Sequence, residues 1–192
     1  MLSSAEIARG SRGAVRFLWQ DVQAPLHFDN TPEGCLRSFQ VMILVAPIYA
    51  FYLVVHYAQV TTTADEGQIA LAEGLRFVVD WLLYPVIFYE IARRRSWLDR
   101  YPRYIAALNW SNLPQIVVLL VAESVASLVP PLGVPLMLGL QVFFFYWFMM
   151  VTRLGLGASW TNAAVLMAVN WVPSYFLSIL VNRFLGVGFP AG

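Results

Sequence analysis

Charged residues are scarce in this 192-residue chain, and lysine is absent. Asp, Glu, Lys and Arg make up 12% of the residues, against about 25% in a soluble domain. The formal net charge of +1 gives no electrostatic basis for binding nucleic acid, so we expect no nucleic-acid partner. Because every basic residue is arginine, a bias typical of GC-rich genomes, we expect a bacterial protein.

Cysteine and histidine are nearly missing as well. The single Cys35 excludes an internal disulfide and a cysteine metal cluster. The two histidines, His27 and His56, are not part of a zinc-protease motif. Serine-hydrolase, phosphate-loop and dinucleotide-binding motifs do not occur either. We therefore predict a non-enzymatic protein with no cofactor and no metal.

The sequence contains long runs of hydrophobic residues with few charges. Hydrophobic residues make up 59% of the chain, and its mean hydropathy is +0.65. A membrane-spanning helix needs about 20 mostly apolar residues, so five such helices occupy most of the chain. The sequence predicts an all-α polytopic membrane protein with transmembrane helices at 36–59, 68–92, 104–129, 133–152 and 159–182.

The first 35 residues have a different pattern. They contain charges throughout and no clean apolar stretch, so we expect no signal peptide. Residues 4–23 are predicted to form an amphipathic helix in the membrane interface, with Arg9, Arg12 and Arg16 on its polar side. The expected organisation is an interfacial segment over 1–35, a transmembrane domain over 36–183 and a short external tail over 184–192.

The arginines predict the orientation of the helices. Ten of them lie in segments that the predicted helices place on the side of the N-terminus. Arg183 lies on the other side, and Arg76 lies within a helix. Since cytoplasmic segments are enriched in basic residues, we expect a bacterial inner-membrane protein with a cytoplasmic N-terminus and a periplasmic C-terminus.

Polar side chains inside the predicted helices define two candidate sites. Ionisable groups are costly in a bilayer and usually face the interior of a bundle. Depth along the helices predicts an outer polar cluster of His56, Glu73, Arg76 and Glu123. Four helices each contribute one residue to a predicted midplane polar group, which consists of Asp80, Gln115, Gln141 and Asn170. This group either builds a binding site or fixes the helix packing through mutual hydrogen bonds.

An arginine-rich loop follows the second predicted helix. Each arginine near a membrane surface contributes about 1 kcal/mol of attraction to anionic lipid. The loop therefore either binds lipid headgroups or only sets the topology. Its candidate headgroup-binding residues are Arg93, Arg94, Arg95, Arg100 and Arg103.

Two stretches of the chain share features with a known membrane-protein family. Residues 103–114 (RYIAALNWSNLP) place an aromatic and a small polar residue before a proline. Residues 146–164 contain YW, then GLGAS and NAA, at the end of one helix and the turn into the next. Both stretches resemble the Yip-type (Ypt-interacting-protein) five-helix integral membrane family. The resemblance covers roughly 36–182 and implies five helices and a cytoplasmic N-terminus, but no catalytic residues.

Two functions follow as alternatives. Short loops, the amphipathic N-terminal segment and the arginine-rich loop favour a membrane adaptor, scaffold or accessory subunit. Its expected partners are the lipid bilayer, including anionic lipid, and a membrane protein or a second copy of the chain. The midplane polar group favours instead a small transporter or channel. The alternatives differ in whether that group faces a water-filled cavity or a dry contact.

Overall fold

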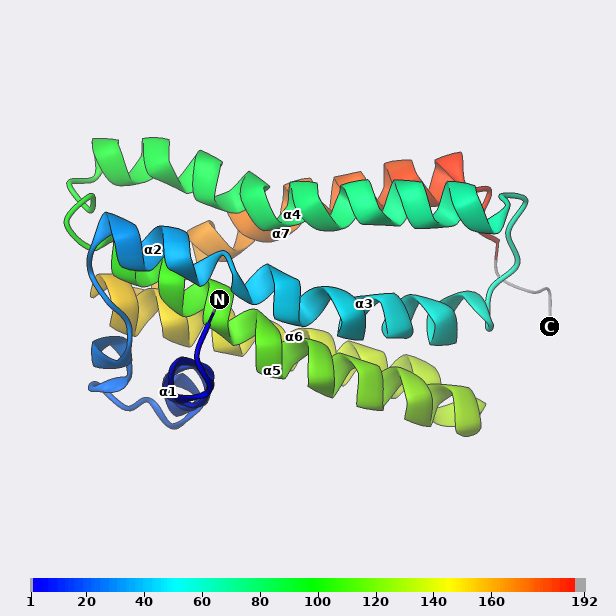
Figure 1. The fold of residues 1–192 in the computed structure, drawn as a ribbon, viewed down its shortest axis with the longest axis horizontal. Coiled ribbons are helices and arrows are strands. Elements are labelled where there is room, and N and C mark those ends of the chain that lie inside the picture. The colour runs from blue at the N-terminus through cyan, green and yellow to red at the C-terminus, as the bar shows by residue number, and fades with distance from the viewer. Residues whose placement is uncertain (1, 189–192) are drawn as a thin grey trace.

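The computed structural model describes residues 2–188, and the regular elements in this range are helices. In chain order they are α1 (Ser4–Arg16), the short 3-10 helices η1 (Phe17–Trp19) and η2 (Ala24–His27), α2 (Pro32–Ser38), α3 (Val41–Tyr57), α4 (Glu66–Arg94), α5 (Tyr101–Leu128), α6 (Pro130–Leu156) and α7 (Trp160–Phe184). The long helices α3 to α7 run alongside one another, whereas α1 is seen nearly end-on and crosses them (Figure 1). The predicted all-α fold is confirmed.

Four segments of the described chain are long and apolar enough to cross a membrane. They are Pro32–Tyr57, which combines α2 and α3, and the helices α5, α6 and α7. At 29 residues α4 is equally long, but its charged residues leave it outside this group. The chain therefore has the composition of a membrane protein.

Two predicted helices differ in detail from those of the structure. The helix expected over 36–59 is two helices, because the α-helical hydrogen bonding is interrupted at Phe39 and Gln40 between α2 and α3. The helix expected over 4–23 ends at Arg16, after which Gln20 adopts a left-handed backbone conformation with φ 56°. Of the predicted tail, residues 189–192 lie outside the described residues.

Capping residues explain where several long helices begin and end. Asp65 and Gln68 each bond the other's backbone N–H, which forms a capping box at the start of α4. The Ser159 side chain accepts from the backbone N–H of Asn162 at the start of α7. At the end of α6, Gly157 takes a φ of 65°, which glycine adopts without steric cost. These local signals set the lengths of the helices.

The helix α5 is the centre of the bundle, and it packs against α3, α6 and both N-terminal helices. Gly10 of α1 lies directly against the Trp110 ring of α5, so closely that a Cβ at this position would overlap the ring. The indole N–H of Trp147 donates to the Ala14 carbonyl at 3.1 Å. The N-terminal segment is thus docked on protein through its small residues.

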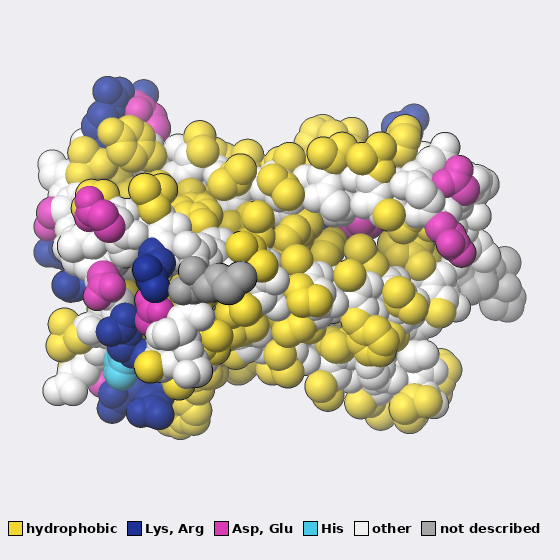
Figure 2. Space-filling view, in the orientation of Figure 1, with side chains coloured by type: hydrophobic (Ala, Val, Ile, Leu, Met, Phe, Trp, Pro, Cys, Tyr) yellow, Lys and Arg dark blue, Asp and Glu magenta, His cyan; other side chains and the backbone are white. Residues whose placement is uncertain are grey.

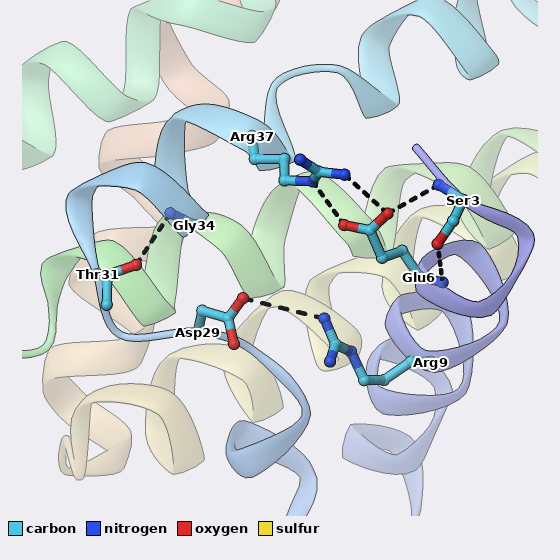
Figure 3. A network of polar contacts seen from close by, with 7 residues as sticks. All are labelled: Ser3, Glu6, Arg9, Asp29, Thr31, Gly34 and Arg37. Carbon is cyan, nitrogen blue, oxygen red and sulfur yellow. Dashed lines mark hydrogen bonds and ion pairs between the residues drawn. The ribbon is translucent and has the colours of Figure 1, made fainter. Parts of the chain in front are cut away.

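A polar network joins α1 to α2 on the surface (Figure 3). The Glu6 carboxylate accepts from Arg37 Nε at 2.5 Å and from Arg37 Nη2 at 3.0 Å. The same carboxylate accepts from the Ser3 backbone N–H at 2.8 Å. Arg9 and Asp29 form a looser ion pair at 3.9 Å. The hydrogen bond from Arg37 is the main reason that the pKa of Glu6 is lowered to about 2, and the Ser3 backbone N–H adds to it.

Charge is concentrated at the ends of the molecule (Figure 2). Most basic side chains gather at one end, over α1, α2 and the 95–100 loop; we call it the arginine-rich end. The opposite end contains the acidic loop before α4. Hydrophobic side chains cover the middle, where Leu71, Val86 and Val142 are each about two-thirds exposed. An apolar belt between two polar ends is what a bilayer requires.

We predict that Gly10→Ala destabilises the protein by about 1–3 kcal/mol, because the added methyl overlaps Trp110. The measurement is thermal unfolding of the protein in nanodiscs, followed by circular dichroism. Gly139→Ala on α6 is the matched control, since a Cβ there meets no atom within 4 Å. Equal unfolding midpoints for the two variants would contradict the close docking of α1.

The lowered pKa of Glu6 predicts a pH dependence of α1 docking. A group whose pKa is depressed on folding adds stability above its ordinary pKa, here 4.5, and loses it as the pH falls toward about 2. We expect protease cleavage after α1 to increase over that interval in the native chain. In Glu6→Gln this increase should be absent, whereas the exposed control Glu66→Gln should behave as the native chain does.

Candidate functional site

A cavity of about 500 Å³ lies among the five long helices. Tyr49 and Tyr52 of α3 form one wall, and residues of α4, α5, α6 and α7 form the others. The helix α4 packs chiefly against α7 and touches α5 only lightly, so it stands away from the centre of the bundle. The cavity is the space between α4 and that centre.

The four predicted midplane residues all line this one cavity. Asp80, Gln115, Gln141 and Asn170 come from α4, α5, α6 and α7, and each lies near the middle of its helix. They do not hydrogen-bond to one another in any pair that the structure records. Their side chains therefore border one shared space.

Two buried polar atoms of residues that line the cavity have no hydrogen-bond partner among the described residues. One is Oδ1 of Asp80, and the other is the indole nitrogen Nε1 of Trp81. Ser174 of α7 lies within hydrogen-bonding reach of the Asp80 carboxyl. Buried polar groups are normally paired, so each of these two atoms needs a partner that the described residues do not supply.

A buried ion pair stands at the end of the cavity that faces away from the arginine-rich end. Glu73 is 2% exposed and accepts from Arg76 Nε at 2.7 Å. Its two oxygens also accept from Tyr49 at 2.9 Å and from Tyr57 at 2.7 Å. Arg76 donates further to Tyr49 at 2.8 Å and to Ser178 at 3.2 Å. The pair thus ties α4 to both α3 and α7.

The predicted outer cluster is two groups rather than one. His56 Nδ1 lies 2.9 Å from Glu123 Oε1, which joins α3 to α5. The Glu73–Arg76 pair forms a separate network, and aromatic contacts connect the two, since the Tyr57 ring packs edge-on against His56 at 5.4 Å. Counting residues along the predicted helices placed the four residues at one depth in the membrane. Such counting does not specify the direction in which each side chain points.

The sequence prediction considered charged and amide side chains, and it missed two serines that belong to the site. Ser174 and Ser178 follow Asn170 at intervals of four on α7, and they oppose Asp80 and Arg76 of the antiparallel α4. Residues four apart share one helix face. A polar stripe on α7 was therefore present in the sequence as a signal for its contact with α4.

Buried hydroxyl groups close the cavity toward the arginine-rich end. Tyr84, which lines the cavity, shares a hydrogen bond of 2.7 Å with Tyr104, and Tyr104 shares one of 2.9 Å with Thr152. Tyr104 and Thr152 are fully buried. The Phe88 ring packs against Tyr104 at 4.7 Å between centroids. This cluster joins α4, α5 and α6 and gives α4 its second attachment.

The arginine-rich loop has fewer uncommitted charges than its sequence indicates. Arg93 and Arg94 both pair with Glu90, at 2.9 and 2.8 Å. Arg100 donates to the Leu156 carbonyl, and Arg103 is half-buried. Arg95 is exposed. The five residues lie at one end of the bundle, where the single carboxylate of Glu90 offsets one of the two positive charges on Arg93 and Arg94.

Neither a metal-binding group in the described part of the chain nor a known relative identifies the chemistry of this site. Within the described residues, no three His, Cys, Asp or Glu side chains gather to hold a metal ion. Comparison with protein-family models, curated proteins and solved structures finds nothing that matches this chain. Membership of the Yip-type family stays a prediction.

We predict that Glu73→Gln destabilises the protein by about 3–5 kcal/mol, because it leaves the buried Arg76 without its counter-charge. The double variant Glu73→Gln/Arg76→Gln should cost less than the single one, since no lone charge remains. Thermal unfolding in nanodiscs measures both. The control Glu90→Gln breaks an exposed ion pair and should cost at most about 1 kcal/mol. A double variant that is less stable than Glu73→Gln would contradict the role of the charge pair.

Proposed function

We propose that the protein spans the bacterial inner membrane five times, with α4 as the fifth span. The support is the position of α4, which runs alongside the four apolar spans and is long enough to cross. Its charged side chains point to partners inside the bundle, which lowers the cost of placing them in a bilayer. The positive-inside rule then gives a cytoplasmic N-terminus, with the arginine-rich end in the cytoplasm.

We propose further that this protein is a small, non-enzymatic transporter that binds a polar solute within the membrane. One observation supports this function best: four helices contribute Asp80, Gln115, Gln141 and Asn170 to one cavity. Residues that only fixed the packing would be expected to bond to each other. A volume of about 500 Å³ lies within the range of about 300–1,000 Å³ typical of small-molecule sites.

The adaptor or scaffold function has weaker support. It depended on an arginine-rich loop available to headgroups and on an amphipathic segment lying on lipid. Arg93 and Arg94 are ion-paired with Glu90, and α1 packs its small residues on α5. The ion pairs lower the net positive charge of the loop, and the docking of α1 on α5 covers part of the N-terminal segment.

A cysteine placed in the cavity tests the transporter proposal. In a Cys35→Ala background, we expect Gln141→Cys to react with a small, water-soluble thiol reagent, because thiol reaction requires the thiolate and hence water. The next residue, Val142, is 68% exposed on the apolar belt. Val142→Cys is the matched control and should react at least about tenfold more slowly, since the surrounding lipid suppresses ionisation.

The measurement is the labelling rate by mass spectrometry, with both variants in nanodiscs. If Gln141→Cys is as unreactive as Val142→Cys, the midplane group is a dry packing contact and the transporter proposal fails.

A further inference from the structure

The charge around the cavity is unbalanced toward the negative. Of the residues that line it, Arg76 and Asp80 carry charge. The Arg76 guanidinium is already paired with Glu73 at 2.7 Å, so these two charges offset each other. Asp80 remains, with one oxygen that has no partner among the described residues.

The nearest other ionisable groups do not reverse this balance. Tyr52, which lines the cavity, stacks on His56 at 5.6 Å, and His56 pairs with Glu123. When Asp80 is ionised, the charges around the cavity therefore sum to a negative value, which attracts a cation and disfavours an anion.

Aromatic rings provide much of the remaining wall. Trp81 and Tyr84 of α4 and Trp171 of α7 all line the cavity. Ring faces attract cations, most strongly those of tryptophan, and sites that combine such rings bind quaternary ammonium groups. An inorganic cation or a proton would neutralise Asp80 but would leave most of the 500 Å³ and the rings unused.

The unpaired indole N–H of Trp81 further limits the chemical class of the ligand. Trp81 lines the same cavity, and its buried indole N–H has no acceptor among the described residues. We infer that the cavity binds an organic monocation, an amine or a quaternary ammonium compound, that also contains a hydrogen-bond acceptor. This inference rests on the proposed function, because it names the substrate class of the same cavity.

Equilibrium binding of radiolabelled choline to the native chain in nanodiscs tests the inference. Choline has a quaternary ammonium group and one hydroxyl oxygen. Its neutral analogue dimethylbutanol, in which carbon replaces the nitrogen, has the same shape and hydroxyl group. We expect choline to bind and the analogue to compete at least about tenfold more weakly, a difference of about 1.4 kcal/mol or more. This comparison needs no variant.

Two variants assign the contacts. Asp80→Asn should lower choline affinity at least about tenfold, whereas the matched control Asp99→Asn, in an exposed loop, should leave it unchanged. Trp81→Phe keeps a ring but removes the N–H. It should weaken binding of choline but not of tetramethylammonium, which has no acceptor.

The outcomes separate the inference from the proposed function. If dimethylbutanol competes as well as choline does, or if Asp80→Asn binds choline normally, charge is not recognised and the inference is overturned. If choline does not bind while Gln141→Cys still reacts with the aqueous reagent, the inference is overturned and the transporter proposal stands. If choline does not bind and the cysteine is unreactive, both are overturned.

Discussion

A buried ion pair, Glu73 with Arg76, is the interaction on which the arrangement of this protein depends. The helix α4 has few close backbone contacts with α3 and α5, and its charged side chains would be costly against lipid. The ion pair instead receives hydrogen bonds from α3 and donates to Ser178 of α7. Polar contacts therefore hold α4 in place, because it has little apolar packing against α3 and α5.

A second attachment of α4, through Tyr84 and Phe88, explains why the fold contains a cavity. Tyr84 bonds to Tyr104 of α5, and Phe88 packs on the same ring. Between this attachment and the ion pair, the middle of α4 stands away from α5 and α6. Asp80 lies in that interval with one oxygen unpaired. A helix that is attached to α3 and α5 on either side of its middle, and whose middle contacts α7, leaves space for a ligand without separating from the bundle.

The sequence predicted how far along its helix each polar residue lies. It predicted only partly the direction in which each side chain points. Counting residues from the helix ends placed Asp80, Gln115, Gln141 and Asn170 at one level, and the structure puts all four around one cavity. The same counting merged His56 with Glu73, which belong to separate networks. The rise per residue is constant at about 1.5 Å, but the rotation of each helix depends on its neighbours.

The sequence by itself determined the helical class, the apolar spans and the concentration of arginine at one end. These follow from composition and local signals such as the Asp65 capping box, which act within one segment of chain. Only the tertiary structure decided that Tyr49 and Tyr57 satisfy Glu73, that α1 docks through Gly10, and that a cavity remains beside α4. Those features depend on which faces of distant helices meet, and contacts between distant segments are not encoded in the periodicity of either one.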